Sequence, residues 1–276
     1  MRDLPPILYR YFSFGPWIEK VVNGTAIRFQ SPLAFNDPFD GRPSVYANLS
    51  DAATEEYYHD LGKRFGMGRA QRRRKIKDLK NQLEKTAGKG AISQELLEKL
   101  MARYGLLCLT PHPDSLLMWS HYGDSHRGLC IGFDTSKDFF RSAAAVSYQD
   151  EYPEIKIGIS SKDDILEKSI YTKASCWKYE DEWRIPKQSW SEQERQSKQL
   201  FAERNWPAPD DIRNIVEHRG HGDYEFNKTA VKEVILGARM PDEDKKQIAE
   251  WISLHNPGVE LRQAKCHDHE YRLVIK

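Results

Sequence analysis

The chain has 276 residues, and its 42 Lys and Arg side chains nearly balance its 41 Asp and Glu side chains, for a formal charge of +1. This balance excludes a global electrostatic attraction to nucleic acid or to an anionic membrane surface. Aromatic residues make up 11% of the chain, which argues against intrinsic disorder, and the length allows a buried core. Residues 1–6 lack the features of a signal peptide, and no apolar run approaches the length of a membrane span. We therefore expect a cytoplasmic protein with no membrane partner.

The N-terminal segment predicts two short strands with a helix between them. Residues 7–12 form an aromatic strand, residues 16–22 a short helix, and residues 25–30 an alternating second strand. Residues 31–40 then predict a loop, because turn-forming residues dominate there.

Residues 51–104 differ in character, since helix formers dominate and residues 69–80 are strongly basic. A solvated helix face is the ordinary interpretation of such a run. The alternative is a docking surface for nucleic acid or for an acidic partner, carried by Arg72, Arg73, Arg74 and Lys75.

From residue 105 onward strands return, with helices between them. Two nearly all-apolar runs, residues 105–110 and 128–134, predict buried strands. The other expected elements are strands at 144–148, 177–184, 231–237, 259–265 and 271–275, helices at 115–122, 160–175 and 241–255, and a polar loop with helix at 190–227. Strands and helices mix without a βαβ rhythm, so the predicted fold class is α+β. We expect a single domain over residues 1–276 with a helical basic insertion at about 51–104.

The four cysteines are scattered without CxxC spacing, which indicates reduced thiols in a cytosolic protein. A zinc site built on residues 266–269 (Cys-His-Asp-His) is conceivable, but no second ligand pair stands at finger-like spacing. We expect no metal.

Residues 177–184 carry two acids, Glu180 and Glu182, among aromatic residues. In an extended strand, residues two positions apart point to the same face. Either an ion pair with Arg184 or Lys178 neutralises these acids, or they act on a positively charged group.

Three separated clusters join aromatic rings to polar or charged groups, at residues 9–11, 119–122 and 179–182. Together they predict a cleft that stacks a planar ring, anchors an anion on Arg10 and places a carboxylate near developing positive charge. Cleavage of a glycosidic bond through an oxocarbenium-like transition state needs such a carboxylate. A metal nuclease would instead use acids such as Asp37, Asp40, Glu180 and Glu182, but Trp183-Arg184 stands where its lysine is expected.

Five blocks in chain order resemble a bacterial family known only as a domain of unknown function, DUF2971. They are residues 8–11 (Leu-Tyr-Arg-Tyr), 35–40 (Phe-Asn-Asp-Pro-Phe-Asp), 118–123 (Met-Trp-Ser-His-Tyr-Gly), 128–134 and 177–184. The resemblance spans about residues 8–240, and it implies relatives but no established activity.

The chain also resembles ADP-ribosyltransferase-like proteins in its opening strand, helix and strand, and in Glu180-Asp181-Glu182, which is similar to the Glu-x-Glu of the arginine-modifying branch. This resemblance implies a split central sheet, mixed or antiparallel, and NAD as a co-substrate. It implies that Glu182 orients NAD and stabilises the oxocarbenium ion, that Glu180 engages the acceptor, and that Arg10 binds the NAD phosphates.

The clusters and this resemblance together give a set of candidate site residues, in which Ser120, His121 or Tyr122 fills the middle position of the signature. The catalytic candidates are Glu182, Glu180, His121 and Tyr122, and the NAD-binding candidates are Tyr9, Arg10, Ser120, Trp119 and Asn36. The Ser-Thr-Ser block of those proteins is absent here.

The leading hypothesis is an NAD-dependent ADP-ribosyltransferase-like enzyme, acting as a toxin or anti-phage effector on nucleic acid or protein. The alternative is a non-catalytic nucleic-acid- or protein-binding module of a defence system, in which Glu182 forms a salt bridge with Arg184, Lys178 or Arg10. The third hypothesis is a metal-dependent nuclease.

Overall fold

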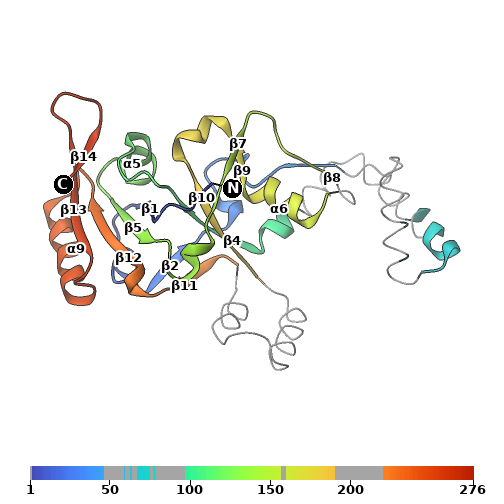
Figure 1. Cartoon of the computed structure of the whole chain (residues 1–276), viewed down its shortest axis with the longest axis horizontal. Helices are drawn as coiled ribbons and strands as arrows, with labels where there is room; N and C mark the ends of the chain where they lie inside the picture. The colour runs from blue at the N-terminus through green and yellow to red at the C-terminus, as the bar shows by residue number, and fades with distance from the viewer. Residues whose placement is uncertain are drawn as a thin grey trace, which may run out of the picture. The chain divides into compact units, whose positions relative to one another are not determined.

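The computed structural model describes residues 2–46, 59, 63, 67–74, 77–78, 97–156, 160–189 and 220–276. The chain divides into two compact units, which are described separately. Unit 1 comprises Met1–Ser31, Tyr104–Val146 and Cys176–Lys276, and unit 2 comprises Pro32–Arg103 and Ser147–Ser175. Both units contain helices and short strands, which confirms the α+β class (Figure 1).

Unit 1 is built on a five-stranded sheet in the order β1-β5-β12-β13-β14. Its strands are β1 (Ile7–Phe12), β5 (Leu129–Asp134), β12 (Val231–Leu236), β13 (Glu260–Cys266) and β14 (Leu273–Ile275). All neighbours are antiparallel except β12 and β13, which are parallel and are joined by α9 (Asp242–His255). The sequence interpretation missed this βαβ unit, because it identified the three elements but not their pairing; a parallel pair requires such a crossover.

Alternating side chains give this sheet two apolar faces. Leu8 and Phe12 of β1 belong to a large cluster that also includes residues of α1 (Ile18–Val22) and α9. Tyr11 is adjacent to Phe12 in the strand and belongs to a second cluster, together with Trp119 of α5 (Leu116–Tyr122). Because successive strand residues point to opposite faces, α9 and α1 cover one face and α5 covers the other.

A second sheet of unit 1 has the order β4-β10-β6, with β4 at Tyr104–Leu109, β10 at Trp183–Gln188 and β6 at Ala144–Ala145. Leu107 and Leu109 of β4 and Trp183 and Ile185 of β10 add to the large cluster. An isolated bridge between Tyr9 and Thr110 joins β1 to the end of β4. The remaining pair is β2 (Ala26–Phe29) with β11 (Gly222–Glu225), and η2 (Asp138–Ser142) and η4 (Lys228–Ala230) are short 3-10 helices.

Residues 177–184 are not one extended strand, which corrects the expectation from the sequence. Residues Ser175–Glu180 form the 3-10 helix η3, and β10 begins only at Trp183. Between them Asp181 adopts a left-handed backbone with a φ of 46°, a conformation that Asp tolerates better than most residues. The same-face argument for Glu180 and Glu182 therefore fails, and their environments must be established separately.

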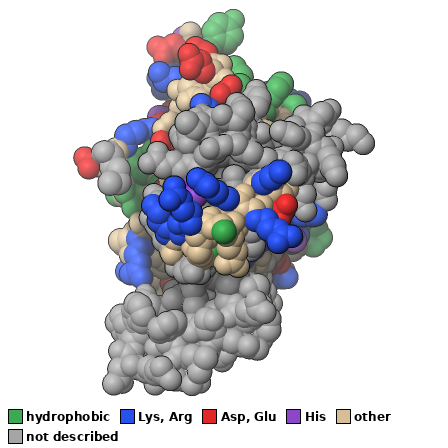
Figure 2. Space-filling model, turned by 90° about the vertical axis from the view of Figure 1, so that its right-hand side faces the viewer, with side chains coloured by type: hydrophobic (Ala, Val, Ile, Leu, Met, Phe, Trp, Pro, Cys, Tyr) green, Lys and Arg blue, Asp and Glu red, His purple; other side chains and the backbone are tan. Residues whose placement is uncertain are grey.

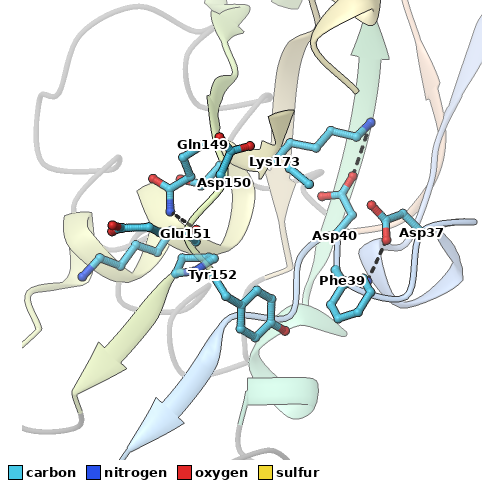
Figure 3. A pocket seen from close by; sticks show the side chains of 12 residues that line it. Asp37, Phe39, Asp40, Gln149, Asp150, Glu151, Tyr152 and Lys173 are labelled. Atoms are coloured by element: carbon cyan, nitrogen blue, oxygen red, sulfur yellow. Dashed lines mark hydrogen bonds and ion pairs between the residues drawn. The ribbon is translucent and has the colours of Figure 1, made fainter. Parts of the chain in front are cut away.

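Unit 2 contains two parallel strand pairs and a helix. β3 (Ser44–Tyr46) pairs with β8 (Glu154–Lys156), and β7 (Ser147–Gln149) pairs with β9 (Thr172–Ala174). The 3-10 turn η1 (Pro32–Ala34) opens the unit, and α6 (Lys162–Ile170) precedes β9. The helix expected over residues 160–175 thus ends at Ile170, and residues 144–148 belong to two strands in different sheets. A pocket lies beside β7 and β9 (Figure 3).

The basic segment is described only in part. Residues 69–74 are helical, and the Arg69, Arg73, Arg74 and Lys77 side chains are exposed. Figure 2 shows Lys and Arg side chains gathered on one face. Arg72 donates from Nη1 to the Met67 carbonyl at 2.8 Å.

Other parts of the expectation lie outside the described residues, namely Lys75, most of residues 47–96 and residues 190–219. The single domain with an insertion at about 51–104 therefore stays a prediction.

Candidate functional site

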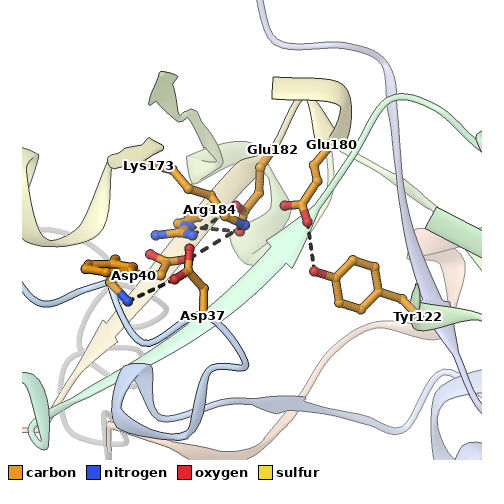
Figure 4. A network of polar contacts seen from close by, with 8 residues as sticks. Asp37, Asp40, Tyr122, Lys173, Glu180, Glu182 and Arg184 are labelled. Atoms are coloured by element: carbon orange, nitrogen blue, oxygen red, sulfur yellow. Dashed lines mark hydrogen bonds and ion pairs between the residues drawn. The ribbon is translucent and has the colours of Figure 1, made fainter. Parts of the chain in front are cut away.

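Glu182 and Arg184 form a buried, two-pronged ion pair in unit 1 (Figure 4). Arg184 donates from Nε to Glu182 Oε1 at 2.8 Å and from Nη2 to Oε2 at 2.9 Å. Arg184 is 0% exposed and Glu182 is also buried. A parallel pair of charge-assisted hydrogen bonds is the strongest geometry available to these groups. The positive charge of Arg184 therefore offsets the negative charge of Glu182 inside the protein.

Glu180 has a different partner. It ends η3, is buried, and accepts a hydrogen bond from the Tyr122 hydroxyl at 2.8 Å (Figure 4). Tyr122 is the last residue of α5, and Tyr122 and Tyr179 both pack against the cluster around Trp119. This packing holds the end of α5 beside η3. These contacts connect Glu180 to α5 and Glu182 to Arg184 of β10.

Arg10 lies on β1 in step with Leu8 and Phe12, on the face opposite to the one that α5 covers. Its Nη1 donates to the Arg28 carbonyl at 2.9 Å, and its guanidinium lies 5.4 Å from the centre of the Phe12 ring. Burial lowers the pKa of Arg10, while the Cys108 and Glu182 side chains act against that shift. Arg10 is therefore within electrostatic reach of Glu182.

The residues at the end of α5 divide into core and surface. Trp119 is fully buried, donates from Nε1 to the Pro113 carbonyl at 2.9 Å, and meets Tyr11 edge to face. Ser120 is exposed and donates to the Leu116 carbonyl at 2.8 Å. His121 is also exposed, with the Trp177 and Tyr179 ring centres each 6.4 Å from its own. The NAD-binding roles of Trp119 and Ser120 stay predictions, and Trp119 has an evident role in the core.

Tyr9 has an acidic partner other than Glu180 and Glu182. Tyr9 packs with the Trp119 cluster, on the face of β1 opposite to that of Leu8 and Phe12, and donates to Glu233 Oε1 at 2.6 Å. Burial and this bond raise the pKa of Tyr9. Asn36 is exposed and belongs to unit 2, as do Asp37 and Asp40 of the nuclease hypothesis.

Two features of unit 1 were missed from the sequence. Asp181 contacts Arg2 at 2.7 Å and His112 at 3.1 Å. Although burial opposes them, these two contacts hold the pKa of Asp181 below its usual range. Lys187 of β10 is buried with its Nζ 4.9, 5.5 and 5.9 Å from the ring centres of Phe139, Tyr224 and Phe29. Burial lowers the pKa of Lys187 to about 8. No local pattern signals either feature, because most of the partners are remote in sequence.

Residues 118–185 match the model of a family described as "Protein of unknown function (DUF2971)". The matched segment holds Tyr122, Glu180, Glu182 and Arg184, and the match confirms the resemblance to this family. No curated protein and no solved structure matches the chain.

In the part of the chain that the structure describes, no helix is long and apolar enough to cross a membrane. The described residues also contain no group of three or more His, Cys, Asp and Glu side chains arranged to hold a metal ion.

Proposed function

We propose that the protein transfers a glycosyl group from NAD to a nucleic-acid or protein acceptor, as a toxin or anti-phage effector of the ADP-ribosyltransferase-like kind. One observation carries the proposal: Tyr122 bonds one of the two acids that precede β10, and Arg10 lies within electrostatic reach of the other. Strand β1, helix α5 and the η3–β10 junction are the three places where the sequence resemblance expects site residues.

Within this proposal the two acids have unequal roles. An oxocarbenium-like sugar is stabilised by a carboxylate whose negative charge can face it. Arg184 engages both oxygens of Glu182 and offsets its charge. We therefore assign the stabilisation of the sugar cation to Glu180 and a positioning role to the Glu182–Arg184 pair. This reverses the assignment that the Glu-x-Glu resemblance implied.

Incubation of the protein with labelled NAD and cell extract tests the proposal. We expect release of nicotinamide and transfer of label to a macromolecule. Glu180→Gln should lower both by at least about 100-fold, as removal of one preorganised electrostatic group does in other enzymes. The amide oxygen can still accept the Tyr122 bond, so the fold should be kept. Glu243→Gln, on the first turn of α9, is the matched control and should be unaffected. Wild-type protein that produces neither product would refute the proposal.

A second candidate, a non-catalytic binding module, is favoured by the buried Glu182–Arg184 pair, because that ion pair was its distinguishing expectation. Under this alternative both acids are structural and the basic segment contacts the partner. The protein would leave NAD intact and would retard nucleic acid in a gel, and changing Arg73 and Arg74 together to Ala would weaken retardation and its salt dependence.

A further inference from the structure

Unit 2 contains a pocket of about 270 Å³ that no part of the proposed function uses. It lies where the parallel strands β7 and β9 end, and the Asp37–Asp40 loop forms its opposite wall (Figure 3). Gly41 turns the chain directly after this loop with a φ of 73°, a left-handed conformation that favours glycine. The volume is close to the lower end of small-molecule sites, which run from roughly 300 to 1,000 Å³.

The charged side chains that line the pocket are mainly acidic. Four are acids (Asp37, Asp40, Asp150 and Glu151) and two are bases (Lys168 and Lys173). Both bases already contact acids: Lys173 lies 3.6 Å from Asp40, and Lys168 lies 2.9 Å from Asp164. The lining therefore carries an excess of negative charge, which disfavours an anion and favours a cation.

Asp37 is the acid best placed to meet a ligand. It is only 8% exposed, and its Oδ1 accepts the Phe39 amide at 2.9 Å. Among the described residues nothing bonds its second oxygen, Oδ2, and the side chain lines the pocket. A cationic N–H donor in the pocket can therefore form a charge-assisted hydrogen bond with this oxygen.

Two exposed aromatic rings stand beside these acids. Phe39 is 63% exposed and Tyr152 is 45% exposed, and their centres lie 5.7 Å apart in an edge-to-face contact. Aromatic faces attract organic cations and stack on planar groups, whereas a bare metal ion gains little from them.

We propose that this pocket binds a small organic cation with a planar group, such as an amidinium or guanidinium compound. The Asp37 carboxylate accepts from the cationic N–H groups, and Phe39 and Tyr152 contact the planar part. Lys173 holds Asp40 in place and disfavours a divalent metal. Every residue that this site uses belongs to unit 2, and none of them has a role in the proposed NAD chemistry.

Isothermal titration with benzamidine, using benzamide as its neutral analogue of the same shape, tests the proposal without NAD. We expect benzamidine to bind with a dissociation constant below about 1 mM. Benzamide should bind at least about tenfold more weakly, because it lacks the charge. Asp37→Asn should weaken benzamidine binding by at least about tenfold while its side-chain oxygen still accepts the Phe39 amide. Phe39→Ala should also weaken binding, with little effect on the melting temperature.

The matched control is Asp242→Asn, which makes the same chemical change at an exposed position of unit 1. It should leave benzamidine binding unchanged. Equal binding of the two probes would overturn the role of charge, and unchanged binding by Asp37→Asn would overturn the location. Failure of wild-type protein to bind benzamidine would overturn the proposal itself, whatever the result with NAD.

Discussion

The Glu182–Arg184 pair makes a quantitative prediction about stability. Glu182→Gln keeps the size of the side chain but deprives the fully buried Arg184 guanidinium of the charge that balances it in this pair. Breaking a buried ion pair from one side costs about 3–5 kcal/mol. With a urea dependence of about 2–3 kcal/mol per molar, the unfolding midpoint should fall by about 1–2.5 M.

Two matched variants separate this effect from a general loss of charge. Glu260→Gln changes an acid of β13 that is 70% exposed and 3.7 Å from Arg262, so it should cost no more than about 1 kcal/mol. The double change Glu182→Leu with Arg184→Met removes both buried charges and should recover most of the lost stability. Urea unfolding followed by circular dichroism measures all three. If Glu182→Gln moves the midpoint no further than Glu260→Gln, the pair is not buried as described and the reasoning fails.

Three further predictions concern other groups. Burial lowers the pKa of Lys187 to about 8, so above that pH the unfolded chain binds more protons than the folded one. The free energy of unfolding should therefore rise by up to about 3 kcal/mol between pH 8 and 10.4. Lys187→Met should flatten this part of the plot of urea midpoint against pH. The pKa of Asp181 is depressed, so its stabilisation is present above the unfolded pKa and is lost as pH falls through the folded pKa. The difference in unfolding free energy between wild type and Asp181→Asn, below about 1 kcal/mol, should therefore vanish under acid conditions. Gly41→Ala should lower the melting temperature through a cost of about 1 kcal/mol, because alanine is strained at a φ of 73°.

The sequence predicted most of unit 1 because its elements carry strong local signals. The apolar runs of β4 and β5 and the alternating runs of β13 and β14 lie within a few residues of their expected positions. Helix α9 also begins as expected, directly after Pro241. Pairing was harder to predict, since nothing in the runs themselves distinguishes the parallel neighbour β13 from an antiparallel one.

The start of β10 shows why the candidate site was only partly predictable. The sequence motif identified Glu180 and Glu182 as candidates. Their hydrogen-bond partners, however, cannot be inferred from the spacing of the residues. Tyr122 reaches Glu180 from a helix 58 positions earlier in the chain. The left-handed Asp181 also breaks the period-two pattern on which the same-face argument relied. The pocket of unit 2 depends on residues brought together from three separate segments, so no local pattern could define it.

The proposed function depends most directly on the role that we assign to Glu180. Nicotinamide release from NAD in the presence of cell extract should be measured for wild-type protein and for Glu180→Gln, with both shown to have the same circular dichroism spectrum. We predict release by the wild type and a loss of at least about 100-fold in the variant. Equal release by the two proteins, or none by the wild type, would contradict the proposed function.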